Sequence, residues 1–224
     1  IAGYSDNYYG YIEGDDSYPE VFVGRFSAER NSDVLTQVNR VIQYEQNPSN
    51  SNAYEVGVGI GSNEGPGDDD EFDYDHLRNI RDVLLDYTYS TGFELYDGSQ
   101  GGEDAEGNPT SSDVQVLLEE GLGIINYTGH GSFSSFASSG YNSSDIDQLT
   151  NTQVHPFIWS VACVNGDFTD ATCFAESWLR ATHNSSPSGA IAALMSTIDQ
   201  SWSPPMEGQD HMNLILAESS DSSN

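Results

Sequence analysis

Two stretches decide the fold, IINYTGHG at residues 124–131 and PFIWSVAC at residues 156–163. Each contains an apolar run with the length and composition of a buried strand, and each run leads into a residue that carries chemistry, His130 in one case and Cys163 in the other. If the two runs are neighbouring parallel strands, the imidazole and the thiol lie side by side at the sheet edge where open α/β folds bind ligands. That layout is typical of a cysteine nucleophile with its general base.

The residue types around this pair suit the same chemistry. A neutral thiol is a poor nucleophile, and a nearby imidazole can hold it as the thiolate near neutral pH. Gly131 and the turn Cys163-Val164-Asn165-Gly166 are small and flexible enough for backbone N–H groups to point at a developing oxyanion. Spacing alone leaves open a second interpretation, in which the cysteine is structural and the histidine belongs to an unrelated loop.

Periodicity in the rest of the chain alternates between strand and helix. Runs 21–26 and 56–60 are strand-like, and the apolar residues between them fall on one helical face after the start signal Asn31-Ser32-Asp33, so a βαβ crossover is expected there. Further strands are expected at 93–96 and 189–195, and further helices at 77–87, 114–118, 173–182 and 207–218. The pattern predicts an α/β fold with a mostly parallel sheet flanked by helices on both faces.

Several sequence blocks carry a resemblance that runs over most of residues 4–218. They are EVFVGRFS at 20–27, NYTGHG at 126–131, VACVNGDF at 161–168, CFAE at 173–176 and STIDQSWSPPM at 196–206. On these blocks the chain resembles the gingipain-type cysteine peptidases of the caspase-like clan, the arginine-specific members above all. The resemblance implies a caspase-like (gingipain) fold and endopeptidase activity, with Cys163 as nucleophile and His130 as general acid and base.

The same resemblance implies three further site residues. Glu64 corresponds to the glutamate that orients the catalytic histidine, Asp73 to the aspartate at the bottom of the S1 pocket, and Trp202 to the tryptophan that walls that pocket. A carboxylate in S1 favours arginine through a bidentate contact, whereas a lysine ammonium needs only a point charge. The stretch 64–75 is shorter than the family pattern and very acidic, which leaves other occupants of the pocket open: Asp70, Glu71 or Asp75, or none, if this is a solvated acidic loop.

Cysteine count and metal spacing leave competing hypotheses. A disulfide between Cys163 and Cys173 would consume the nucleophile, but the resemblance implies a buried structural Cys173 beside a free catalytic cysteine. Zinc binding by His130, Cys163, Cys173 and His155 lacks CxxC or HExxH spacing. Catalysis of this type requires no cofactor. Structural calcium stays open, with unknown ligands, because the runs Asp15-Asp16 and 68–70 lie outside any EF-hand pattern.

The charge balance is extreme. The chain has 36 acidic residues against six Lys and Arg combined, for a net charge of −30 at pH 7, and the acids are dispersed along its length. Nucleic acid would be repelled by such a surface. A dispersed acidic surface fits a protein that works in high salt, where screening relieves self-repulsion. We therefore expect salt adaptation, with an acidic cation-binding surface module as the competing interpretation.

Length and flanks complete the expectations. The 224 residues are enough for one sizeable core, and no apolar run approaches the roughly 20 residues of a membrane span. The resemblance implies that residues 1–218 are the central part of a peptidase domain with further sequence on both sides, and residues 219–224 (SSDSSN) look like a frayed or truncated end. It also implies a secreted or cell-surface monomer acting on proteins or peptides. A Lys-specific or catalytically silent, peptide-binding relative remains the alternative.

Overall fold

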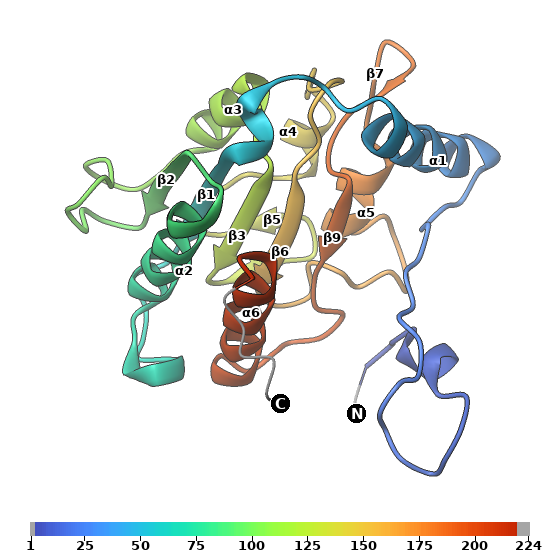
Figure 1. Cartoon of the computed structure of the whole chain (residues 1–224), viewed down its shortest axis with the longest axis horizontal. Helices are drawn as coiled ribbons and strands as arrows, with labels where there is room; N and C mark the ends of the chain where they lie inside the picture. The colour runs from blue at the N-terminus through green and yellow to red at the C-terminus, as the bar shows by residue number, and fades with distance from the viewer. Residues whose placement is uncertain (1–2, 219–224) are drawn as a thin grey trace.

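A parallel β-sheet forms the centre of the computed structural model, which describes residues 3–218 (Figure 1). All neighbouring strands pair in parallel in the order β2-β1-β3-β6-β9. The strands are β1 (Val56–Gly61), β2 (Thr91–Tyr96), β3 (Ile124–Thr128), β6 (Phe157–Val161) and β9 (Ala192–Leu194). The predicted α/β class is confirmed. The predicted frayed end, 219–224, lies outside the described residues.

Helices cover both faces of this sheet. One face carries α2 (Asp73–Tyr87) and α6 (Ser203–Leu216), seen in front of the strands in Figure 1. The other carries α3 (Ser111–Glu120), α4 (Ser143–Ile146) and α5 (Phe174–Arg180), and α1 (Asn31–Gln46) packs against α5. Short antiparallel pairs complete the list: β4 (Gly131–Ser132) with β5 (Ser135–Phe136), and β7 (Thr182–His183) with β8 (Ser186–Pro187).

Two apolar clusters fill the space between sheet and helices. The larger includes Ile125 and Ile158 from the central strands and Phe174 and Trp178 from α5. The smaller lies under α2 and contains Leu77, Ile80, Leu84, Tyr96 and Ile124. Central parallel strands are covered on both faces, which is why their sequences are continuous apolar runs instead of alternating ones.

Glycines in β1 allow α2 to approach the sheet closely. A Cβ atom added to Gly61 would lie 2.8 Å from the Leu77 side chain of α2, and one added to Gly59 would lie 3.3 Å from the Leu77 Cβ. Any larger residue at these positions would push α2 outward. The first turn of α2, which begins at Asp73, is thereby held next to the carboxyl end of β1.

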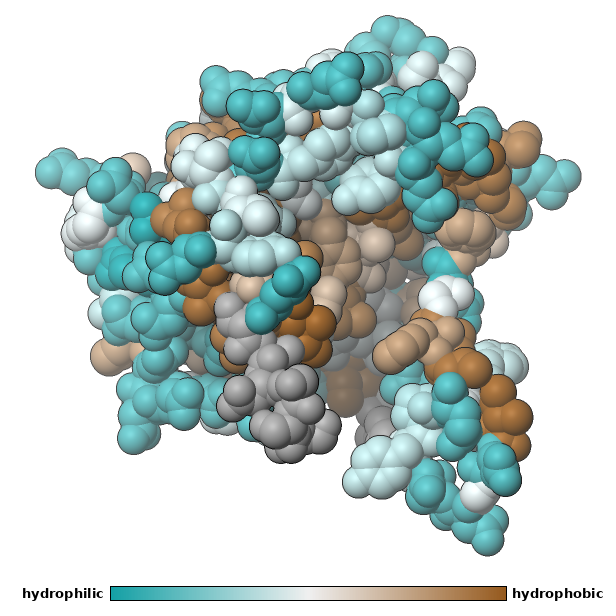
Figure 2. Space-filling model, viewed as in Figure 1, coloured by the Kyte–Doolittle hydropathy of each residue, from teal (hydrophilic) through white to brown (hydrophobic). Residues whose placement is uncertain are grey.

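The segment 21–26 is not a strand, so this prediction and the βαβ crossover built on it are wrong. Phe22 is fully exposed and the segment pairs with no strand among residues 3–218. It belongs to the N-terminal arm, residues 3–26, which leaves the body of the molecule at the lower right of Figure 1 and shows hydrophobic groups in Figure 2. Strand propensity produces a strand only where a partner edge is present.

Short 3-10 helices at Asn7–Gly10, Asn52–Glu55 and Asp68–Asp70 lie in the connecting segments. In the part of the chain that the structure describes, no helix is long and apolar enough to cross a membrane.

Candidate active site

The carboxyl ends of the parallel strands bring the predicted site residues to one edge of the sheet. Thr128 of β3 pairs with Val161 of β6, and His130 and Cys163 each follow two residues later. Glu64 follows three residues after Gly61, the last residue of β1, which pairs with Thr128. Because parallel strands end at a common edge, this shared register places imidazole, thiol and carboxylate on neighbouring loops.

A strained turn follows the nucleophile candidate. Val164 has φ of 50°, in the left-handed region that β-branched residues rarely adopt. The turn is held by two backbone hydrogen bonds, from Val164 N–H to the Ile198 carbonyl (3.1 Å) and from Gly166 N–H to the Ser196 carbonyl (2.8 Å). Cys163 remains partly exposed, with its Sγ 3.9 Å from the Gln200 carbonyl oxygen. Local strain of this kind concentrates at functional sites.

His130 is held at its backbone and oriented at its ring. Its carbonyl accepts hydrogen bonds from the Tyr127 hydroxyl and from the Ala137 N–H. Its Nε2 lies 3.0 Å from Glu64 Oε1, and both side chains are about half exposed, at 55% and 54%. The Trp202 ring meets the imidazole edge-on at 5.1 Å between centroids. With Nε2 engaged by Glu64, Nδ1 is the ring nitrogen left for a thiol.

Asp73 is fully buried at the start of α2. Its carboxylate accepts hydrogen bonds from the Ser62 hydroxyl and, at 2.6 Å, from the Trp202 indole N–H. Burial raises the pKa of Asp73, and these two hydrogen bonds oppose the rise. Trp202 therefore contacts both the buried carboxylate and His130, which brings the predicted S1 residues next to the predicted catalytic histidine.

The alternative acids of the loop lie elsewhere. Asp70 is exposed, Glu71 accepts a hydrogen bond from Asn79 at 2.6 Å, and Asp75 lies 3.9 Å from Arg78. Of the acids of 64–75, Glu64 contacts His130 and Asp73 contacts Trp202.

The disulfide and zinc hypotheses do not fit the geometry. Cys163 and Cys173 are both free, and Cys173 is fully buried, which raises the pKa of its thiol to about 11. His155 precedes β6, at the opposite end of the strand from Cys163, and its Nδ1 lies 3.3 Å from the Gly189 carbonyl. Within residues 3–218, no three His, Cys, Asp or Glu side chains converge to hold a metal ion. The proposed zinc ligands are therefore not together.

Comparison with known proteins identifies the family of this chain. The sequence profile of peptidase family C25 matches residues 2–222. The chain belongs to peptidase family C25.

Relatives in this family agree with the match. The chain is 40% identical over 218 residues to gingipain R2 of Porphyromonas gingivalis, which covers 96% of this chain and 28% of that protein. It is 24% identical over 201 residues to Lys-gingipain of the same organism, covering 88% of this chain and 11% of that protein. The chain thus spans well under a third of the length of these curated relatives.

A solved structure agrees with the fold. The C25 chain superposes with a TM-score of 0.89 on the crystal structure of the Arg-specific cysteine proteinase gingipain R (RGPB), at 40% identity, covering 96% of this chain and 49% of that chain. The predicted gingipain fold is confirmed by this match.

Two side chains next to the candidate site were given no role of their own by sequence reasoning. Ser62 is buried, donates to Asp73 and accepts from the Glu64 N–H at 3.1 Å, so it connects the two acids. Asn165 is fully buried and donates to the carbonyls of Ser132 and Ser135. For Ser62 a signal was available, because it directly follows a strand at the edge where sites form.

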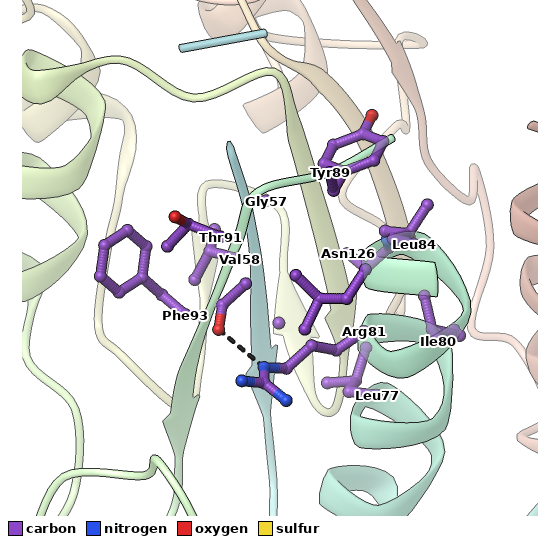
Figure 3. Close-up of a pocket in the computed structure, with 13 residues that line it drawn as sticks. Gly57, Val58, Leu77, Ile80, Arg81, Leu84, Tyr89, Thr91, Phe93 and Asn126 are labelled. Atoms are coloured by element: carbon purple, nitrogen blue, oxygen red, sulfur yellow. Dashed lines mark hydrogen bonds between the residues drawn. The ribbon is translucent and has the colours of Figure 1, made fainter. Parts of the chain in front are cut away.

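A small pocket elsewhere in the C25 chain is unsuited to a peptide. It lies between α2 and strands β1 and β2, is lined by residues such as Leu77, Arg81 and Phe93, and has a volume of about 10 Å³ (Figure 3). That volume holds about one water molecule. None of Cys163, His130, Glu64, Asp73 or Trp202 lines it.

Proposed function

We propose that this chain carries the active site of a cysteine endopeptidase that cleaves after a basic residue, arginine being favoured. One observation carries the proposal: His130 and Cys163 follow paired residues of adjacent parallel strands at the same offset, and Glu64 lies 3.0 Å from the imidazole. Nucleophile, base and base-orienting group are thus arranged in the order that covalent acyl transfer needs.

In the proposed reaction, Cys163 Sγ attacks the scissile carbonyl carbon and its proton passes to His130. The imidazolium then donates that proton to the departing amine, and the acyl group remains as a thioester on Cys163. Water, deprotonated by His130, hydrolyses the thioester and restores the thiol. Glu64 fixes the tautomer and orientation of the ring throughout.

The oxyanion is assigned to backbone N–H groups of Gly131 and Cys163. Two other donors of the turn, the N–H groups of Val164 and Gly166, are already bonded to carbonyls of the 196–198 segment. A Cβ atom on Gly131 would lie 2.8 Å from the Cys163 carbonyl oxygen, so the two backbones approach closely. Preorganised backbone donors of this kind stabilise a tetrahedral intermediate strongly.

Asp73 and Trp202 are assigned to the S1 subsite. The Asp73 carboxylate is buried and bonded to the Trp202 indole N–H, so a substrate guanidinium would replace that N–H and stack on the displaced indole. A buried carboxylate pairs with a bidentate guanidinium better than with an ammonium, which supports arginine over lysine.

The net charge and the resemblance to gingipains support a proposal for the conditions and the location in which the enzyme works. A net charge of −30 supports activity in high salt, where screening limits repulsion between acids. We propose a secreted or cell-surface monomer that acts on proteins or peptides and needs no catalytic cofactor. Structural calcium remains a hypothesis without assigned ligands.

The test is hydrolysis of matched fluorogenic peptides ending in Arg, Lys or Leu, from low to molar salt, with Cys163→Ala as control. We expect Arg-selective turnover that increases with salt and disappears in the variant. Equal cleavage of Arg, Lys and Leu peptides would remove Asp73 from S1, whereas equal cleavage of Arg and Lys peptides alone would remove only the preference for arginine. An absence of turnover by folded protein at every salt concentration would favour a peptide-binding relative.

A further inference from the structure

Asn165 occupies an unusual place, between the loop of the histidine and the turn of the cysteine. It lies two residues after Cys163 and its side chain is fully buried. The amide nitrogen donates to the carbonyls of Ser132 (2.6 Å) and Ser135 (3.0 Å), and the amide oxygen accepts from the Ser160 hydroxyl (3.0 Å). A single side chain thus joins the hairpin β4–β5 to β6.

The bridged hairpin begins directly after the catalytic histidine. Gly131 is its first residue, and a Cβ atom there would lie 2.9 Å from the Asn165 amide oxygen. The start of α5 joins the same assembly, because the Phe174 N–H donates to the Phe133 carbonyl (2.8 Å) and the Ala175 N–H donates to the Asn165 carbonyl (2.9 Å). Histidine loop, cysteine turn and α5 are therefore one hydrogen-bonded unit.

The contact between the His130 ring and Glu64 is more exposed to solvent than the Asn165 hydrogen bonds. The His130–Glu64 pair is about half exposed on both sides, and exposed ion pairs constrain geometry poorly. The Asn165 side chain is fully buried, and its hydrogen bonds to the loop carbonyls and to Ser160 are part-buried or buried, so losing them leaves a buried amide without partners.

We propose that Asn165 is a positioning residue that sets the distance between His130 and Cys163 by bridging their two loops. This inference rests on the proposed function, since it assumes that the two side chains form the reactive pair. Asn165 contacts neither substrate nor reacting atoms; it acts through the backbone of the two loops.

The experiment measures how fast iodoacetamide alkylates Cys163 at pH 6 and at pH 9, with the modified peptide quantified by mass spectrometry. Cys173 is buried and does not compete. In the wild type, a close imidazole keeps alkylation at pH 6 fast relative to pH 9. In Asn165→Ala we expect the pH 6 to pH 9 rate ratio to fall roughly tenfold or more, and kcat to fall similarly with little change in KM.

A matched control comes from Asn151, which is also buried and also makes three side-chain hydrogen bonds. Its amide donates to the carbonyls of Val154 (3.1 Å) and Gly189 (2.9 Å) and accepts from the Gly189 N–H (2.8 Å). It braces the loop before β6, at the opposite end of the strand from Cys163. Asn151→Ala should lower the melting temperature as Asn165→Ala does, with the alkylation ratio and kcat unchanged.

Failure of the positioning role and failure of the proposed function give different results. The positioning role is overturned if Asn165→Ala loses only melting temperature and keeps the wild-type alkylation ratio and kcat. Asn165→Asp, which preserves shape and removes the N–H donors, makes the same measurement if the alanine variant does not fold, and Ser160→Ala should give a smaller decrease in the ratio. If wild-type Cys163 itself shows the pH ratio of free glutathione, the proposed function fails instead.

Discussion

The carboxyl edge of the sheet and the protein interior each contain a cysteine and a histidine, in very different environments. Cys163 and His130 are at the edge, partly exposed and next to each other's loops. Cys173 and His155 are in the interior, fully or almost fully buried. Burial raises the pKa of the Cys173 thiol to about 11 and, helped by the nearby Arg40, lowers the pKa of His155 to about 4.

Solvent access, and not residue identity, separates the proposed reactive pair from the buried pair. A buried thiol that stays protonated and a buried imidazole that stays neutral contribute packing and hydrogen bonds but no chemistry.

The largest effect should separate the two cysteines. Cys163→Ala removes the proposed nucleophile and should reduce kcat/KM by about 10³-fold or more, with thermal stability nearly unchanged. Cys173→Ala removes a buried side chain and should lower thermal stability while preserving kcat. Peptide hydrolysis and thermal melts on both variants check this, and a reversed pattern would exchange the roles of the two thiols.

The interior histidine should act on stability alone. Since the pKa of His155 is lowered in the folded state, the unfolded chain binds more protons between about pH 6.5 and 4, and His155 makes the fold less stable as pH falls through that window. The loss amounts to roughly 2–3 kcal/mol by pH 4.5.

His155→Phe should remove this part of the pH dependence. Urea unfolding at pH 7.5 and 4.5 measures it as a difference from wild type, which is needed because Asp210, whose pKa is raised to about 7 by burial and by Asp68 and Asp69, acts in the opposite direction. An unchanged difference between the two pH values would show that His155 is not the responsible group.

At the carboxyl edge, the buried carboxylate should decide specificity. Asp73→Asn keeps the hydrogen-bonding shape and removes the charge, so kcat/KM for an Arg peptide should fall about 100-fold, with hydrolysis of a Leu peptide little affected. Asp75→Asn, on the same helix but outside the Trp202 contact, is the matched control. If Asp75→Asn had the larger effect, the S1 assignment would move to that residue.

The residues at the carboxyl edge of the sheet could be predicted from the sequence better than the buried residues that hold them in place. The apolar runs within residues 124–131 and 156–163 can be read from the sequence, and their pairing as parallel neighbours was a condition of the prediction that the fold then met. The exposed segment 21–26 has the same local pattern, yet a strand also needs a partner edge, which no local pattern reports.

Hydrogen bonds between positions far apart in the chain could not be predicted either, because local sequence patterns do not report tertiary partners. Asn165 bonds to residues 30 or more positions earlier, and Asp73 is sealed by Trp202, 129 positions later. The family resemblance named Asp73 and Trp202, but their mutual hydrogen bond emerged only from the fold. Long-range hydrogen bonds depend on packing that spacing along the chain does not encode.

The smallest effect is expected at Glu64, the exposed partner of His130. Glu64→Gln retains a hydrogen-bond acceptor for Nε2 and removes the charge, and because both side chains are about half exposed, kcat should fall by no more than about tenfold. The decrease should shrink in molar salt, where the wild-type charge is already screened. Measured beside Asn165→Ala, this variant compares the exposed support of His130 with the buried one. A loss of about 10³-fold in Glu64→Gln would show that the carboxylate charge, and not the buried bridge, controls the imidazole.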